Sequence, residues 1–326
     1  MNIADKIFDI QTEDEFNQCS LAVFRYQAEN SPIYRQFLEI LQVNPQTIHH
    51  YKAIPFLPIQ FFKSQAIITE NKPVELTFTS SGTTGMISSR HLVADKEWYI
   101  RSFRKTFAQF YGEVKDIAIL ALLPSYLERE GSSLIFMVDD LMQRSEQKES
   151  NYFLYNHEEL FNTLLRLKEK KVKTILFGVT YALLDFIEQY QLHFPDLIVM
   201  ETGGMKGKRK EMVREELHAI LSQGFGLSKI HSEYGMTELL SQGYSSGDGL
   251  FKLPPWMKIL IREVNDPFTL VDQSKTGAIN VIDLANYHSC SFIASQDLGR
   301  CHEDESFEIL GRFDHADIRG CNLLVQ

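Results

Sequence analysis

The sequence is poor in the features that mark several common protein classes. It has four cysteines in 326 residues, too few for a disulfide scaffold and too scattered for a zinc knuckle. No segment approaches the run of about 18 apolar residues that a transmembrane helix needs. The N-terminus is acidic and amphipathic, unlike a signal peptide. We therefore expect a soluble, cytoplasmic protein with reduced thiols and no stable membrane insertion.

Basic residues are also in deficit. The chain has 33 lysines and arginines against 43 acidic residues, a formal net charge of -10. A general nucleic-acid-binding protein needs a basic excess to neutralise phosphates, so this composition argues against nucleic acid as a partner. No repeat and no linker rich in Pro, Gly or Ser divides the chain.

Three familiar catalytic motifs are missing. No glycine-rich segment has the G-x-x-x-x-G-K-[ST] spacing of a P-loop, and no G-x-G-x-x-G dinucleotide fingerprint is present. The segment "NHEELF" lacks the second histidine of H-E-x-x-H, which excludes a zincin. A P-loop ATPase and a Rossmann dehydrogenase are excluded on the same grounds.

Short apolar runs alternate with helical patterns along the middle of the chain. We expect helices within residues 12–41 and at residues 96–111, 157–170 and 181–190, and an extended path through "IPFLPIQFF". The runs "DIAILALL", "KTILFGV" and "LIVMETG" are typical of buried parallel strands. Strands alternating with helices predict an α/β fold with a mostly parallel sheet. After about Leu250 shorter strands such as "GAINVIDL" and "FEILGR" predict a β-rich end.

One small-residue segment is a candidate for binding phosphate. "TSSGTTG" follows a strand-like run and could present backbone N–H groups and hydroxyls to an anion. A surface turn without a ligand fits the same letters. The residues concerned are Ser80, Ser81, Gly82, Thr83, Thr84 and Gly85.

Three later segments favour the nucleotide interpretation. "HSEYGMTELLSQG" supplies Tyr234, Thr237 and Glu238, which can cover a purine, bond a phosphate and hold a divalent cation; a helix start capped by Thr237 is the alternative. "SQDLGR" places Asp297 before a glycine turn, suited to ribose hydroxyls, or else a turn stabilised by its own aspartate. "GRFDHADIRGCNLL" supplies Arg312, or else forms a solvated hairpin.

In their order and spacing, these four segments resemble the adenylate-forming superfamily of acyl-CoA synthetases and peptide-synthetase adenylation domains. The resemblance covers roughly residues 55–326. It implies the large N-terminal-type domain of those enzymes, with ATP and Mg²⁺ as cofactors and Glu238 as metal ligand. It also implies an adenine-lining turn at Gly203 and Gly204, continued by Tyr234 and Gly235, with the ribose held by Asp297 and Arg312.

Two departures narrow the resemblance. The family's phosphate loop continues into Pro and Lys, whereas "GMISSRH" follows here, so Arg90 is expected to supply the positive charge. The chain also ends at Gln326, soon after Arg312, where ordinary members continue into a C-terminal domain with a catalytic lysine. This short form is similar to the acyl-protein synthetases, with phenylacetate-CoA ligases as cousins.

The resemblance to acyl-protein synthetases implies a cysteine nucleophile near the C-terminus, and Cys321 in "IRGCNLLVQ" matches it. Arg319 would favour the thiolate, lowering the thiol pKa from about 8.5. Asp314 and Asp317 act in the opposite direction, and the apolar tail could instead bury the cysteine.

We therefore expect one adenylate-forming domain over residues 1–326, with a helical part (1–54), an α/β core (55–250) and a β-rich part (251–326). Its expected reaction is activation of a carboxylic acid, with a fatty acid as the expected substrate, as acyl-adenylate, with Thr237 and Glu238 as catalytic residues. Transfer to Cys321 and then to a reductase-type protein would follow. The alternatives are a ligase with an external thiol acceptor, such as coenzyme A, and a non-catalytic nucleotide-binding subunit of a reductase complex.

Overall fold

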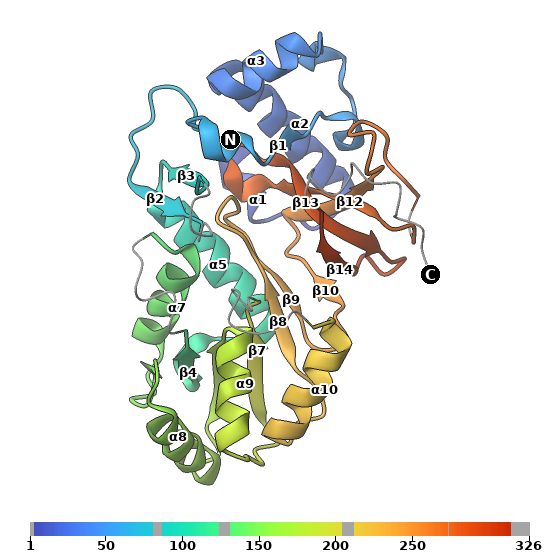
Figure 1. Ribbon diagram of the computed structural model, residues 1–326. Coiled ribbons are helices and arrows are strands. Elements are labelled where there is room, and N and C mark those ends of the chain that lie inside the picture. Colours follow the sequence, from blue (N-terminus) through green and yellow to red (C-terminus); the bar gives the residue numbers. More distant parts are fainter. Residues whose placement is uncertain (1–2, 81–86, 124–130, 204–211, 273, 314–326) are drawn as a thin grey trace. The chain divides into compact units, whose positions relative to one another are not determined.

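The computed structural model describes residues 3–80, 87–123, 131–203, 212–272 and 274–313. It divides into two compact units (Figure 1). Unit 1 comprises residues 1–75, 91–94 and 255–326, and unit 2 comprises residues 76–90 and 95–254. The prediction of a single domain over residues 1–326 stays a prediction.

Unit 2 is an α/β layer structure. Its sheet has the order β10-β9-β8-β7-β6-β4-β5, and the pairs from β8 to β5 are parallel, as the sequence predicts. The strands are β2 (Leu76–Thr79), β4 (Ile117–Leu122), β5 (Asn151–Tyr152), β6 (Lys173–Gly178), β7 (Leu197–Glu201), β8 (His231–Tyr234), β9 (Gly243–Ser245) and β10 (Phe251–Lys252). The helices are α5 (Lys96–Tyr111), η3 (Val114–Asp116), α7 (Ser133–Arg144), α8 (His157–Glu169), α9 (Thr180–Gln189) and α10 (Arg214–Phe225).

Local signals explain where these elements begin and end. Helix α5 has the predicted bounds because the Asp95 carboxylate accepts the Trp98 amide at its start, and Gly112 takes a φ of 84° at its end. Every residue of β4 is buried, as expected for a parallel strand covered on both faces. The prediction missed α7, whose N-cap Ser132 accepts the Ile135 amide, and α10.

Unit 1 joins helices from the start of the chain to strands from its end (Figure 1). Strands β11 to β14 pair antiparallel in order, and β1 pairs parallel with β13. Its helices are α1 (Ile3–Ile7), α2 (Glu13–Asn30), α3 (Pro32–Ile40), η1 (Pro45–Thr47), η2 (Tyr51–Ala53), α4 (Phe61–Ser64) and η4 (Leu284–Asn286). Its strands are β1 (Leu57–Pro58), β3 (Arg90–Val93, whose first residue belongs to unit 2), β11 (Met257–Arg262), β12 (Gly277–Asp283), β13 (Phe292–Cys301) and β14 (Phe307–Arg312).

Contacts between distant segments hold unit 1 together. Phe8 packs edge-on against Trp256, with ring centroids 5.0 Å apart. The Lys258 ammonium lies 2.8 Å from a Glu13 carboxylate oxygen. The Gln27 side-chain amide donates to the Asn286 and Tyr287 carbonyls. The first helices and the last strands therefore share one core.

One local prediction was wrong. The glycine turn expected after Asp297 is absent, because Asp297 to Arg300 lie within strand β13. At Thr237 the predicted turn is present and the alternative, a helix start, is not, since Tyr234 ends β8 and a non-helical turn follows. Among the described helices, none is long and apolar enough to span a membrane.

Candidate functional site

The carboxyl ends of the parallel strands in unit 2 form one edge of the sheet. Strands β6, β7 and β8 end at Gly178, Glu201 and Tyr234. Open α/β sheets bind ligands outside this edge. The segment predicted to line adenine follows β7, and the "YGMTE" segment follows β8, so the fold brings both to the same edge.

Glu201, the last residue of β7, contacts the segments that follow β6 and β7 as well as strand β8. Its carboxylate accepts the Thr180 hydroxyl and the Gly203 amide, each at 2.6 Å. The Ser232 hydroxyl lies 3.4 Å from its second oxygen, and the side chain is 6% exposed. A buried carboxylate that accepts several hydrogen bonds fixes the groups that donate to it. Glu201 thus fixes the backbone of the turn at Gly203.

Gly203 has the conformation and the surroundings that close approach of a ligand requires. Its φ of 78° is left-handed, which favours glycine. Among the residues that the structure describes, a Cβ placed there would meet no heavy atom within 4 Å. Gly204, the other glycine predicted to line adenine, lies outside the described residues.

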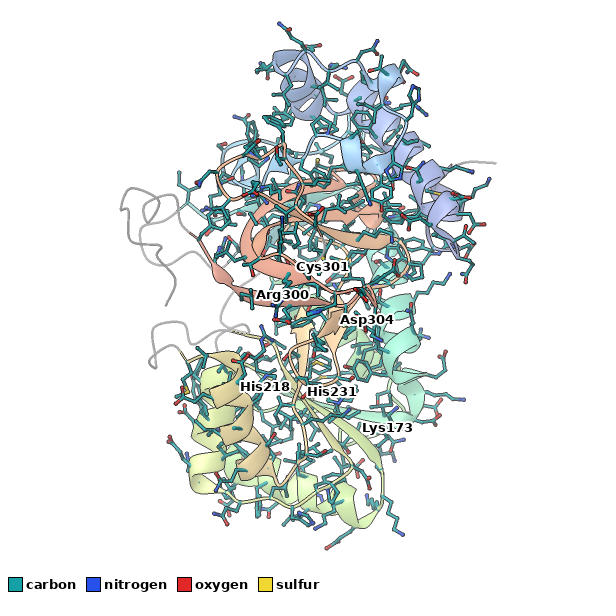
Figure 2. The ribbon with its side chains drawn as sticks, turned by 90° about the vertical axis from the view of Figure 1, so that its right-hand side faces the viewer. Lys173, His218, His231, Arg300, Cys301 and Asp304 are labelled. Carbon is teal, nitrogen blue, oxygen red and sulfur yellow. The ribbon has the colours of Figure 1, made fainter. Side chains whose placement is uncertain are left out.

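Sequence reasoning missed Glu201 and its neighbour His218. His218, on α10, lies 3.3 Å from the Ser232 hydroxyl and is labelled in Figure 2. Burial lowers the pKa of His218, and the Glu201 charge opposes that shift. The one sequence signal for Glu201 was a carboxylate closing the apolar run "LIVME", since its donors come from other segments.

Glu201→Ala is expected to lower both stability and nucleotide affinity. The change leaves the Thr180 hydroxyl and the Gly203 amide without their acceptor, and each such loss costs about 1–3 kcal/mol. Thermal denaturation should show a lower Tm, and the KM for ATP should rise. Glu201→Gln, which keeps one acceptor oxygen, should lie between, and exposed Glu169→Ala is the control. A wild-type Tm in Glu201→Ala would contradict this role.

A second carboxyl group adjoins the same edge. Glu233 on β8 is largely buried, and burial, followed by the nearby Glu201 charge, raises its pKa to about 8. One of its oxygens lies against Gly235, where a Cβ would clash with it. Two residues before Glu233 on the strand, the His231 ring nitrogen lies 3.2 Å from the Tyr111 hydroxyl, and burial lowers the His231 pKa to about 4. The histidine is therefore neutral at pH 7.

The raised pKa of Glu233 makes stability fall with pH. Between its ordinary value of 4.5 and its folded value of about 8, the folded chain holds a proton that the unfolded chain has released. The free energy of unfolding therefore decreases as pH rises through this window and then levels off. Glu233→Gln mimics the protonated form, so its advantage in Tm over wild type should be larger at pH 8 than at pH 5. Equal pH dependence of the two proteins would refute this.

The segment after β8 carries the predicted catalytic residues. Tyr234 is buried, with its ring 6.1 Å from that of Phe251. Thr237 is half-buried, and Glu238 is 5% exposed. The described residues contain no cluster of three His, Cys, Asp or Glu side chains that could hold a metal. Mg²⁺ is commonly coordinated by one or two carboxylates together with substrate phosphates. A single carboxylate at Glu238 is consistent with that coordination.

The predicted phosphate loop is described only at its ends. The Ser80 hydroxyl accepts the Ser89 amide at 2.8 Å, and the Ser80 amide donates to the Ser89 carbonyl. These bonds join the two ends of the loop. Arg90 begins β3 and is exposed. The other predicted loop residues (Ser81, Gly82, Thr83, Thr84 and Gly85) and Cys321 lie outside the described residues.

In unit 1 the two predicted ribose ligands lie directly opposite each other. Asp297 on β13 and Arg312 on β14 are register partners. The two residues come from different sequence motifs, and the antiparallel pairing of β13 with β14 brings them together. The pairing of β13 with β14 thus places both predicted ribose ligands at one position of the sheet.

Comparison with known proteins identifies the family. The family model described as "Acyl-protein synthetase, LuxE" matches residues 6–326. The chain belongs to the acyl-protein synthetase family. It is accordingly a ligase, as the sequence predicts.

A curated relative and two solved structures are similar to this chain. The long-chain-fatty-acid–luciferin-component ligase of Vibrio harveyi is 25% identical over 92% of this chain and 84% of its own length. A 2-hydroxyisobutyryl-CoA ligase structure matches with a TM-score of 0.65 at 13% identity, covering 95% of this chain and 78% of that one. ATP-bound MatB from Rhodopseudomonas palustris matches with a TM-score of 0.57 at 17% identity, covering 76% of this chain and 50% of that one. The predicted α/β fold of adenylate-forming enzymes is confirmed.

Proposed function

We propose that this protein activates a fatty acid with Mg-ATP as an acyl-adenylate and then transfers the acyl group to the thiol of Cys321. The observation that carries the proposal is the shared carboxyl edge, where β7 and β8 deliver Gly203 and the "YGMTE" segment together. The name of the Vibrio harveyi relative supports a long-chain fatty acid as substrate.

In the first step the substrate carboxylate attacks the α-phosphorus of ATP and pyrophosphate leaves. The turn at Gly203 and the Tyr234–Gly235 segment hold adenine, and Asp297 with Arg312 holds the ribose. Binding of the β- and γ-phosphates is assigned to Ser80 to Gly85 and Arg90, and binding of the α-phosphate to Thr237. Mg²⁺, when bound, neutralises phosphate charge, and Glu238 is the side chain that would hold it. Positioning and charge stabilisation supply most of the rate in such displacements.

In the second step the Cys321 thiolate attacks the acyl carbonyl and AMP leaves, so a thioester forms. The other three cysteines are poorly suited to this role. Burial raises the pKa of Cys290 to about 12 and of Cys301 to about 11, and it also raises that of Cys19. Few of these thiols are ionised at neutral pH, and the thiolate is the nucleophile. A reductase-type protein would then accept the acyl group.

Pyrophosphate exchange tests the first step. The purified protein is incubated with Mg-ATP, labelled pyrophosphate and one acid at a time, from acetate to palmitate and including aryl acids. We expect exchange that depends on a fatty acid. Exchange with an aryl or short-chain acid alone would contradict the proposed substrate. No exchange with any acid, in protein that binds ATP, would favour the non-catalytic subunit instead.

A further inference from the structure

Arg262 carries a buried guanidinium whose hydrogen-bond partners, among the described residues, are neutral oxygens. It lies at the end of β11 and is 6% exposed. It donates to the Ile279 carbonyl at 2.8 Å, to the Asn280 side-chain oxygen at 3.0 Å and to the Ser295 carbonyl at 2.8 Å. Within the described part of the chain no carboxylate pairs with it, and burial alone lowers its pKa to about 10. Burying an uncompensated charge is expensive, so the position needs an explanation beyond packing.

The carbonyls that Arg262 binds flank an irregularity in the sheet. Strands β12 and β13 pair Ala278 with Leu298 and then Asn280 with Ala294. Ile279 on β12 is therefore opposed by the whole segment Ser295–Asp297 on β13. Such a bulge takes residues out of the ladder and re-aims their side chains. Asp297 lies in this segment.

Hydrogen bonds from outside the ladder hold the bulge in its shape. The Arg262 guanidinium spans the two strands from Ile279 to Ser295. The Ser295 hydroxyl donates to the Ile279 carbonyl at 3.0 Å and accepts the Asp297 amide at 3.1 Å. The Phe313 amide donates to the Gln296 carbonyl. The backbone of Asp297 is thus fixed through Ser295 by Arg262.

A second irregularity lies in the pairing of β13 with β14. Between β13 and β14 the register shifts after the pair Leu298 and Gly311, so that Gly299 faces Ile309. Gly311 takes a φ of 152°, in the region that favours glycine. The Asp297–Arg312 pair is therefore bracketed by two departures from regular pairing.

We propose that Arg262 is a positioning residue, which shapes the bulge that aims Asp297 at the ribose of the nucleotide. The inference rests on the proposed function. The planar fork of arginine suits this task, because one side chain reaches carbonyls on two strands. A lysine ammonium keeps the charge but does not reproduce that fork.

The test compares two nucleotides that differ only at the ribose. Calorimetry gives the Kd of ATP and of 2′,3′-dideoxy-ATP, without acid, for wild type and variants. Wild type should prefer ATP by on the order of tenfold or more, as expected for hydrogen bonds to a charged group. In Arg262→Lys that ratio should fall towards one, as in Asp297→Asn, with little change in the Kd of the dideoxy analogue. A merely structural defect would weaken both nucleotides alike and would overturn the inference.

Two further variants keep the test decisive. Ser295→Ala, which nearly preserves volume, removes the hydroxyl that links the bulge to the Asp297 amide, and it should lower the ratio even if Arg262→Lys does not fold. Arg300→Lys is the matched control: it lies on the same strand and pairs with Glu308 at 2.9 Å, so its ratio should equal that of wild type. If Arg262→Lys keeps the wild-type ratio of the two Kd values while Asp297→Asn loses it, the inference about Arg262 is overturned. The assignment of Asp297 to the nucleotide then stands. If wild type binds no ATP, or if Asp297→Asn keeps the ratio, the nucleotide assignment fails and the inference with it.

Discussion

Replacing Cys321 with serine is expected to abolish the acyl-enzyme while leaving fatty-acid-dependent pyrophosphate exchange in place. Serine keeps nearly the same size, but its hydroxyl is a far weaker nucleophile than a thiolate unless a base activates it. The adenylation step uses other residues, so the two steps should separate. The acyl-adenylate would then form without an internal acceptor.

Intact-protein mass measures this directly. Wild type incubated with Mg-ATP and the acid found by exchange should gain the mass of one acyl group, and hydroxylamine should remove it. Cys321→Ser should gain nothing. The control is Cys301→Ser, whose half-buried thiol contacts the Ile259 carbonyl at 3.8 Å, and it should acylate like wild type. A hydroxylamine-sensitive gain in Cys321→Ser would assign the carrier to another residue.

The second large effect is expected from Glu238→Gln. Glutamine matches the shape of the buried side chain, which is 5% exposed, so packing is kept while the charge that would hold Mg²⁺ is lost. Losing one preorganised electrostatic contact lowers the rate by on the order of 10²–10³. Pyrophosphate exchange should fall by that factor and recover in part at high Mg²⁺.

Its matched control is Glu216→Gln, an exposed carboxylate in the first turn of α10. That variant should exchange pyrophosphate like wild type. Equal Tm values for Glu238→Gln and wild type would show that the loss is not one of folding. Near-wild-type exchange in Glu238→Gln at low Mg²⁺ would remove Glu238 from the metal site.

The sequence predicted what depends on local pattern. The buried apolar runs became the parallel strands β4, β6 and β7, since full burial on both faces leaves a continuous apolar signature. Helix α5 was predicted with its observed bounds, and Asp95 and Gly112 bracket it in the structure. The motif residues Tyr234, Asp297 and Arg312 were found by their order along the chain, and their roles stay predictions.

What depends on pairing between distant segments was out of reach. The bulge at Ser295–Asp297 exists only relative to β12, so the sequence alone suggested a turn there. Glu201 gains its role from a helix-start threonine and from a serine on the next strand. Arg262 reads as one polar residue ending a strand, and only the fold shows that it is buried against carbonyls.

The division of the chain has a consequence for the order of folding. Unit 2 is nearly continuous in sequence, whereas unit 1 needs residues from both ends. During synthesis the N-terminal end of a chain emerges first, so α2 exists long before η4 and β13, on which its buried face depends. Contacts of such sequence separation also slow folding. We therefore expect unit 2 to fold first. Until the last strands are made, the apolar face of the N-terminal helices stays exposed, where it can aggregate or bind chaperones.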